Sequence, residues 1–245
     1  MARWVDGRVY VEDSVAIANA VSGKELLDRY MRDIEVLTLG LTRMRGTSMR
    51  VGPVELLRFG RPKVSKYQVH WPIESGLAVG APGGAFKVRA TGGRLVATLE
   101  GYRPRVPPFV YTLVQLPIHH LLTRLYLLRA RGRMPAPGVR ATPRDRFRAA
   151  SVDVALCLTL AGLAGRRGPR PTLAIAAAYH VACWSIWGRT LGGLVVRQRV
   201  VGIDGSRMTA AQSLLRLGLL PAYWVTGRPV HDELACTEVV TDRAT

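Results

Sequence analysis

Asp153 is the one charged residue in an otherwise apolar segment, residues 149–165. A bare carboxylate inside a bilayer costs several kcal/mol, so this acid needs a proton or a cation. We expect its partner to be an arginine, because arginines flank every apolar segment of this part of the chain. The arginines within reach of Asp153 in a helical arrangement are Arg146, Arg189, Arg216 and Arg228.

An acid among arginines can serve two purposes. It can relay protons or couple an ion to transport, or it can form an ion pair that clamps the terminal segment onto a helical hairpin. We favour the ion pair, because a transport path needs more than one intramembrane acid unless several copies of the chain assemble. His231 and Asp232 place a titratable base beside an acid. Adjacent side chains rarely cooperate, so we interpret this pair as an interfacial polar cluster. The predicted membrane charge cluster, with a structural or ion-coupling role, comprises Arg146, Asp153, Arg189, Arg199, Arg216, Arg228 and Asp232.

No motif in the sequence predicts catalysis or a metal centre. G-x-S-x-G, H-E-x-x-H and C-x-x-C sequences do not occur. His119 and His120 would point about 100° apart on a helix, which is awkward for binding one metal ion. Residues 80–84 are rich in glycine, but no Lys-Ser/Thr pair follows them as in a phosphate-binding loop. We therefore expect no enzymatic activity, no cofactor and no bound metal.

The chain carries a large excess of positive charge. It has 35 Lys and Arg against 17 Asp and Glu in 245 residues, a formal charge of +18 at pH 7. Apolar residues make up 48% of the chain, which excludes a disordered polymer. The charge predicts a polyanionic partner. The basic residues are not interleaved with aromatic ones as in nucleic-acid-binding surfaces, so the sequence favours an anionic lipid membrane and no nucleic acid.

Two apolar segments, residues 149–165 and 172–187, predict a pair of membrane helices. Each would extend about 25 Å, slightly less than the ~30 Å hydrocarbon core of a bilayer. Seven arginines lie in the twenty residues before the first segment, four in the twenty after the second, and three between them. This imbalance places both termini in the cytoplasm and predicts a multi-pass protein of the cell membrane. The alternative is a buried hairpin of a soluble protein. The flanking arginines are Arg144, Arg146, Arg148, Arg166, Arg167, Arg170 and Arg189.

A third apolar segment, residues 210–225, is interrupted by Arg216 and Pro221. It predicts a short interfacial or re-entrant helix rather than a full span. At the other end of the chain, residues 1–6 contain no apolar stretch of the kind found in a secretory signal, which agrees with a cytoplasmic N-terminal part.

The N-terminal half predicts an α+β domain. Apolar residues alternate in residues 8–17 and again in residues 67–73, as in half-buried strands. Gly92-Gly93 separates two further alternating runs, which predicts a β-hairpin. Ser22 and Glu25 form a helix-start motif before an apolar stripe at helical spacing. A long closing helix over residues 108–129 completes an order of elements that resembles helix-grip domains of the START-like kind.

Pro, Gly and Arg alternate around residue 135, as is typical of a linker. The predicted organisation is a cytoplasmic α+β domain over residues 1–130, a linker over 131–143, a helical membrane domain over 144–240 and a tail over 241–245.

Three blocks of the C-terminal part, which together run from Arg146 to Val240, combine arginines and aspartates with small and apolar residues. The first block is Arg146-Phe147-Arg148-Ala149-Ala150-Ser151-Val152-Asp153. The second is Trp187-Gly188-Arg189-Thr190-Leu191-Gly192 with Arg199-Val200-Val201, Asp204-Gly205 and then Arg216. The third runs from Arg228 through His231-Asp232 to Thr237-Glu238-Val239-Val240. In this order the blocks resemble the RDD family, membrane proteins named for an Arg and two Asp. The family usually has glycine at the position of Cys236.

These observations predict a non-catalytic accessory, scaffold or lipid-interacting protein, acting as a homo-oligomer or with a membrane partner protein. The resemblance also includes members linked to cation movement, so an ion- or proton-coupled transporter component using Asp153 is an alternative. A third alternative is a carrier that binds an apolar ligand in its N-terminal domain.

Overall fold

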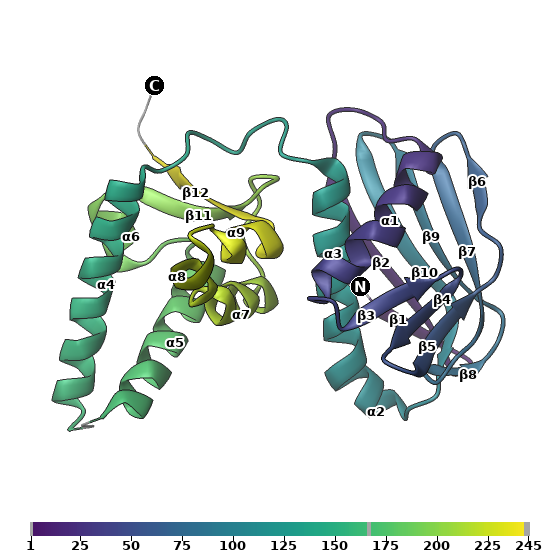
Figure 1. The fold of residues 1–245 in the computed structure, drawn as a ribbon, viewed down its shortest axis with the longest axis horizontal. Coiled ribbons are helices and arrows are strands. Elements are labelled where there is room, and N and C mark those ends of the chain that lie inside the picture. The colour runs from purple at the N-terminus through teal and green to yellow at the C-terminus, as the bar shows by residue number, and fades with distance from the viewer. Residues whose placement is uncertain (1, 166–167, 243–245) are drawn as a thin grey trace. The chain divides into compact units, whose positions relative to one another are not determined.

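The computed structural model describes residues 2–165 and 168–242. The chain divides into two compact units, Met1–Gly132 and Arg133–Thr245, and each is described by itself (Figure 1). The division falls inside the predicted linker. This linker is shorter at its start than expected, because the helix before it runs to Arg131.

A ten-stranded antiparallel sheet forms the framework of the N-terminal unit. Its order is β1-β2-β10-β9-β7-β5-β4-β3, with β6 beside β7 and β8 beside β10. The first long strand, β2, thus lies next to the last one, β10. Beyond β10 the strands follow in reverse order of sequence and end at β3. The strands are β1 (Ala2–Val5), β2 (Arg8–Ala16), β3 (Thr42–Arg45), β4 (Ser48–Val51), β5 (Val54–Phe59), β6 (Lys63–Ser65), β7 (Gln68–Ser75), β8 (Val79–Ala81), β9 (Gly84–Thr91) and β10 (Arg94–Pro104).

Local sequence signals account for the turns and the first helix of this unit. Gly92 and Gly93 adopt φ of +55° and +69°, the left-handed conformation that a tight hairpin turn needs between β9 and β10. The hydroxyl of Ser22 accepts a hydrogen bond from the Glu25 N–H at 3.2 Å and starts α1 (Gly23–Leu37). The predicted α+β character of the N-terminal unit is therefore confirmed.

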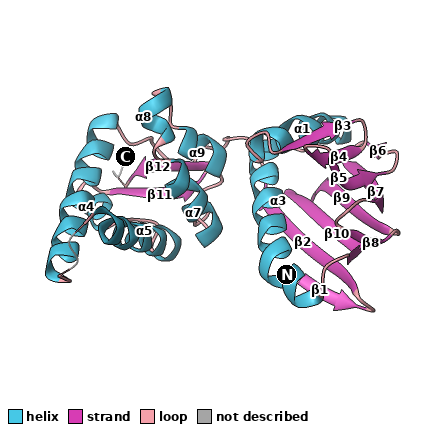
Figure 2. Ribbon diagram, turned by 60° about the horizontal axis from the view of Figure 1, so that its bottom comes forward, coloured by secondary structure: helices cyan, strands magenta, loops and turns pink. Residues whose placement is uncertain are grey.

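Helical structure closes the N-terminal unit over residues 108–131. It comprises α2 (Pro108–Val110), a π-helical turn η1 (Tyr111–Gln115) and α3 (Leu116–Arg131). Helices α1 and α3 cover one face of the sheet (Figures 1 and 2). Between helices and sheet, the ring of Tyr30 contacts the rings of Trp71, Phe86 and Tyr126 with centroids 4.8–5.5 Å apart.

The C-terminal unit combines helices with a two-stranded antiparallel sheet. The longest helices, α4 and α5, form a hairpin, and α5 packs on α7. The sheet pairs residues 198–202 with residues 237–241, a feature that the sequence did not predict. The elements are α4 (Pro143–Leu163), α5 (Pro169–Ile186), α6 (Leu191–Val195), β11 (Gln198–Gly202), α7 (Ala210–Leu219), α8 (Ala222–Thr226), α9 (Val230–Ala235) and β12 (Thr237–Thr241).

The two predicted apolar helices and the broken third segment are present as helices. Residues 210–225 form α7 and α8, which are separated at Leu220–Pro221. Over residues 2–165 and 168–242, no helix has both the length and the apolar character required to cross a membrane. A small core, Ala141, Trp184, Val200, Met208 and Val239, lies between the helices and the two-stranded sheet.

Candidate functional site

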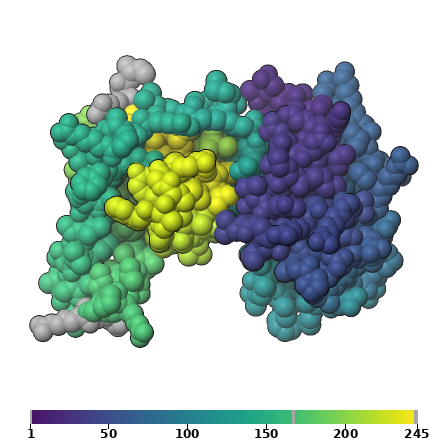
Figure 3. Space-filling view, in the orientation of Figure 1, coloured from purple at the N-terminus to yellow at the C-terminus, as the bar shows by residue number. Residues whose placement is uncertain are grey.

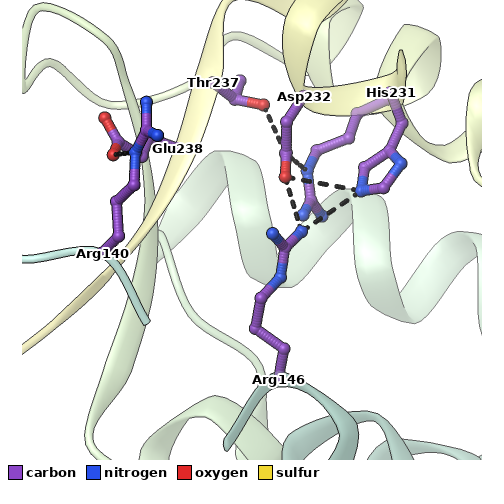
Figure 4. Close-up of polar contacts among 7 residues, drawn as sticks. Arg140, Arg146, His231, Asp232, Thr237 and Glu238 are labelled. Atoms are coloured by element: carbon purple, nitrogen blue, oxygen red, sulfur yellow. Dashed lines mark hydrogen bonds and ion pairs between the residues drawn. The ribbon is translucent and has the colours of Figure 1, made fainter. Parts of the chain in front are cut away.

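Asp232, near the start of α9, gathers side chains from three other segments (Figure 4). Its Oδ1 accepts hydrogen bonds from the Arg216 Nε at 2.8 Å and from the Thr237 hydroxyl at 2.9 Å. Its Oδ2 accepts one from the Arg146 Nη2 at 2.5 Å and lies 3.4 Å from the His231 Nε2. Helices α4, α7 and α9 and the strand β12 therefore meet at one carboxylate.

The Asp232 site is nearly closed to solvent. The side chains of Arg216 and Asp232 are 5% and 10% exposed. Burial by itself would raise the pKa of the Asp232 carboxyl. The charge of Arg216, the hydrogen bond from His231 and the charge of Arg146 outweigh burial and hold this pKa well below its ordinary value. Asp232 is therefore ionised at neutral pH.

Neighbouring contacts fix the position of Arg216. Its guanidinium carbon lies 4.3 Å from the ring centroid of Trp184 on α5, a cation–π contact. One turn earlier on α7, the Gln212 Nε2 donates to the Ala235 carbonyl at 3.0 Å, which ties α7 to the end of α9. Arg216 is thus held on two sides, by a carboxylate and by an aromatic ring.

A second buried carboxylate, Glu238 on β12, binds the chain segment that leads into α4. Arg133 donates from Nε and Nη2 to its two oxygens at 2.8 Å each. The Arg140 Nε contacts the same carboxylate (Figure 4). Burial would raise the pKa of Glu238, but the hydrogen bonds from Arg133 and Arg140 lower it overall. The Glu238 contacts attach the start of the C-terminal unit to its last strand.

Asp153 occupies a different place in the C-terminal unit. Its Oδ1 accepts the Tyr179 hydroxyl at 2.7 Å and the Gly192 N–H at 2.9 Å, and its Oδ2 lies 3.9 Å from the His180 Nε2. The Tyr179 oxygen in turn accepts the Leu191 N–H at 2.8 Å. The carboxylate therefore binds the N-terminal end of α6 to the α4–α5 hairpin.

The expectation that an arginine pairs with Asp153 is wrong for the described part of the chain. Of the four arginines considered, Arg146 and Arg216 bind Asp232 instead. Arg228 pairs with Glu233 at 3.2 Å. The physical reason is that backbone and tyrosine donors already satisfy Asp153, so the arginines reach the acid on α9.

The remaining predicted arginines form a separate group at the end of β12. Arg189 and Arg199 lie 2.9 and 3.2 Å from the two oxygens of Asp242. Asp242 was predicted to belong to a tail beyond the domain. Two further predicted residues, Arg166 and Arg167, fall outside the described residues.

The predicted charge cluster therefore separates into three sites, centred on Asp232, Asp153 and Asp242, and Arg228 lies apart from them in its pair with Glu233. Sequence reasoning missed Tyr179, Glu238 and the backbone of Gly192 as participants. The glycine at position 192 could have indicated a close approach of two helices. A Cβ at this position would lie 2.0 Å from the Ala149 carbonyl oxygen. Only glycine lets α6 approach α4 this closely.

In chemical terms the Asp232 and Asp153 sites hold segments together. The oxygens of Asp232 and the Oδ1 of Asp153 bind donors from the protein itself. Over residues 2–165 and 168–242, no three His, Cys, Asp or Glu side chains come together as a metal site.

Comparison with known families identifies part of the C-terminal unit. Residues 171–231 match the RDD family. The sequence resemblance is confirmed over these residues, which include most of α5 and all of α6, β11, α7 and α8. Members of the RDD family are typically membrane-associated, so the matched segment is similar to part of a membrane protein. The first block, from Arg146 to Asp153, lies outside the matched range. The part of the third block that follows His231 lies outside it as well.

Searches of curated proteins and of solved structures give no significant match. The START-like order of the N-terminal unit therefore remains a prediction. One departure from the RDD pattern has a structural consequence. Cys236, where the family usually has glycine, ends α9 in the left-handed conformation with φ of +50°. Glycine adopts this conformation more readily than any other residue.

Proposed function

We propose that this protein is a non-catalytic accessory or scaffold of the cell membrane. In this proposal α4 and α5 of the RDD-like unit enter the bilayer, and both termini lie in the cytoplasm. The basic N-terminal unit faces anionic lipid headgroups. A scaffold also needs a second chain, which would be another copy or a membrane partner protein.

The observation that supports membrane entry is the outward-facing apolar surface of the hairpin. Leu158 and Leu163 on α4 are 58% and 80% exposed, and Leu173 on α5 is 67% exposed. In the view of Figures 1 and 3, the connected ends of α4 and α5 extend beyond the other elements of their own unit. Large exposed apolar patches on a protein of this size mark contact with a membrane or another protein.

The charge distribution supports an orientation in which the N-terminal unit faces anionic lipid headgroups. Residues 1–148 carry 25 basic and 11 acidic residues, a net charge of +14, whereas residues 149–245 carry 10 and 6, a net charge of +4. Basic residues near a membrane are attracted to anionic lipid by about 1 kcal/mol each within a Debye length. The proposal therefore includes lipid as a partner and does not include nucleic acid.

The experiment that tests membrane entry places charge on the hairpin. The double variant Leu158→Arg/Leu173→Arg should move the protein from the carbonate-resistant membrane fraction to the soluble fraction, because charged side chains inside a bilayer are costly. The matched control is Leu77→Arg, since Leu77 is a leucine of the N-terminal unit with 54% exposure. Equal extraction of both variants and the parent chain would contradict membrane entry.

An ion-coupled role for Asp153 is the competing function. Its contacts with Tyr179 and Gly192 favour a structural role, because a proton carrier must release its partners during each cycle. Asp153→Asn keeps a carbonyl oxygen that can accept the same two hydrogen bonds. We expect this variant to fold and to leave pH-dependent ion flux across proteoliposomes unchanged. Loss of a measurable flux in a folded Asp153→Asn protein would establish transport instead.

A further inference from the structure

A cavity of about 190 Å³ lies inside the N-terminal unit, between the helices and the sheet. Residues from α1, from the strands and from the helical segment 111–126 line it. An apolar cavity of about 150 Å³ suffices to hold a benzene molecule. The space here is therefore large enough for a guest of roughly eight non-hydrogen atoms, scaled from that case.

Two residues of the cavity lining each carry a buried polar atom that has no hydrogen-bond partner in the described chain. The Tyr111 hydroxyl and the Gln115 Oε1 are both buried and unpartnered, and both residues line the cavity. Tyr111 is only 2% exposed. Leaving a buried polar atom unpaired costs about 1–3 kcal/mol, so such atoms usually have a partner. A bound molecule with a hydroxyl group would satisfy both, accepting from Tyr111 and donating to Gln115.

The two residues belong to one irregular turn of the backbone. Tyr111 and Gln115 are the first and last residues of the π-helical turn η1. Single π-turns in helical segments often occur at functional sites, because they redirect side chains that a regular helix would place elsewhere. Here the turn places both residues in the lining of the same cavity.

The rest of the lining selects for an aromatic and uncharged guest. The rings of Tyr30, Phe86 and Tyr102 line the cavity, and aromatic walls favour aromatic guests through edge and offset ring contacts. The lining residues include no Asp, Glu, Lys or Arg. His119 also lines the cavity, and burial lowers its pKa to about 4, so it is neutral at pH 7.

We propose that the N-terminal unit binds a small, uncharged aromatic molecule with a hydroxyl group, held by Tyr111 and Gln115. This inference goes beyond the proposed membrane role and does not depend on it. The walls are largely apolar, so water alone would find few partners in the cavity.

The test uses two probes of equal size and the full-length protein in lipid nanodiscs. One probe is 4-fluorophenol, and the other is 4-fluorotoluene, which has a methyl group in place of the hydroxyl. Fluorine NMR reports a bound signal for each probe. Lipid takes up the probes equally in all variants, so differences between variants isolate binding to the protein.

We expect 4-fluorophenol to bind about tenfold more tightly than 4-fluorotoluene after correction for lipid uptake, because only the phenol satisfies both buried atoms. Tyr111→Phe should remove most of this difference and leave 4-fluorotoluene unchanged. Tyr67→Phe is the matched control, because Tyr67 is exposed at the surface and outside the cavity lining.

Ala78→Leu provides a second variant, since Ala78 lines the cavity and a larger side chain there should exclude both probes. The proposal is overturned if neither probe gives a bound signal, if both bind equally, or if Tyr111→Phe and Tyr67→Phe behave alike. Because Tyr111→Phe keeps the ring, it tests the hydrogen bond even where Ala78→Leu does not fold.

Discussion

The most deeply buried side chains of the N-terminal unit are apolar or aromatic, as at Leu26, Val69 and Trp71. Among the described residues of that unit, Asp33 is the buried carboxylate. The C-terminal unit instead buries Asp153, Arg216, Asp232 and Glu238 together with several neutral polar side chains. One chain therefore contains two different ways of fixing a tertiary structure.

The difference follows from where each unit places its apolar residues. In the N-terminal unit they face inward, between the sheet and the two covering helices. In the C-terminal unit many of them lie on the outside of α4 and α5, which leaves only a small internal core. Ion pairs and hydrogen bonds then decide how the short elements pack, since buried polar pairs give specific geometry even where they add little net stability.

The largest expected effect comes from removing a buried charge in the C-terminal unit. Asp232→Ala leaves the guanidinium of Arg216 buried without its carboxylate, so we expect a loss of about 3–5 kcal/mol. The three cysteines of the chain are all buried and all lie in this unit. Thiol labelling in urea therefore measures its unfolding separately from the N-terminal unit.

Asp242→Ala is the control for this measurement. Its carboxylate is paired with two arginines but is 26% exposed, so its removal should cost no more than about 1 kcal/mol. Similar losses for Asp232→Ala and Asp242→Ala would mean that burial of charge does not distinguish the two sites.

A smaller loss of stability should follow from adding a methyl group where α4 and α6 are in close contact. Gly192→Ala puts a Cβ against the Ala149 carbonyl, and overpacking of this kind costs about 2–3 kcal/mol. Gly162→Ala, in the same hairpin, meets no atom within 4 Å. It should stabilise α4 by about 0.5–1 kcal/mol, because alanine favours helix over glycine. The same thiol assay compares the two variants, and a neutral Gly192→Ala would refute the close approach.

Acid should weaken the two units in different pH ranges. Burial, reinforced by His120 and opposed by Asp13, lowers the pKa of His119 from 6.5 to about 4. The unfolded chain therefore binds more protons between these values, and the stability of the N-terminal unit falls as pH drops from 6.5 to 4. Because residue His119 as a whole is only partly buried, solvent screening reduces this contribution, and we expect a loss of about 2 kcal/mol at most.

The C-terminal unit should respond at lower pH. The pKa values of Asp232 and Glu238 are depressed in the folded state, so their contribution is present above the unfolded values and is lost as pH falls below about 4. Hydrogen exchange, pulsed at a fixed pH after equilibration in urea, resolves both units. His119→Gln should flatten the response of the N-terminal unit alone, and an unchanged response would show that another group titrates there.

Removing a helix cap should cost little stability, and the cost should be equal in both units. The Ser22 hydroxyl caps α1, and the Thr142 hydroxyl caps α4 by accepting the Asp145 N–H at 3.2 Å. Ser22→Ala and Thr142→Ala should each cost about 1 kcal/mol, measured by the same hydrogen-exchange experiment. Equal costs would show that the units share their local chemistry and differ in their cores; a markedly larger cost in one unit would contradict this.

Much of the N-terminal fold is predictable because its signals are local. Alternation located β2, β7, β9 and β10, and a glycine pair located the turn between the last two. Helix α1 followed from a capping serine and an apolar stripe. The pairing of β2 with β10 could not be predicted, since residues about eighty positions apart come together only when the whole sheet forms.

The candidate site was predictable in composition but not in connectivity. The sequence indicated that Arg146, Asp153, Arg216 and Asp232 belong to a charge cluster. It did not reveal that Asp153 binds Gly192 and Tyr179 and leaves the arginines to Asp232. Many acid–arginine pairings are compatible with one sequence, because each depends on how the intervening loops close.

By itself, the sequence determined the helices and strands that follow from periodicity, the positive charge, and the resemblance to the RDD family that the match over residues 171–231 confirms. These features depend on side chains a few residues apart, or on composition. Only the tertiary structure decided the pairing of β11 with β12, the partners of each buried carboxylate, and the cavity beside the π-turn at Tyr111. Each of these requires distant segments to meet, and the geometry of their meeting is set by packing across the whole unit.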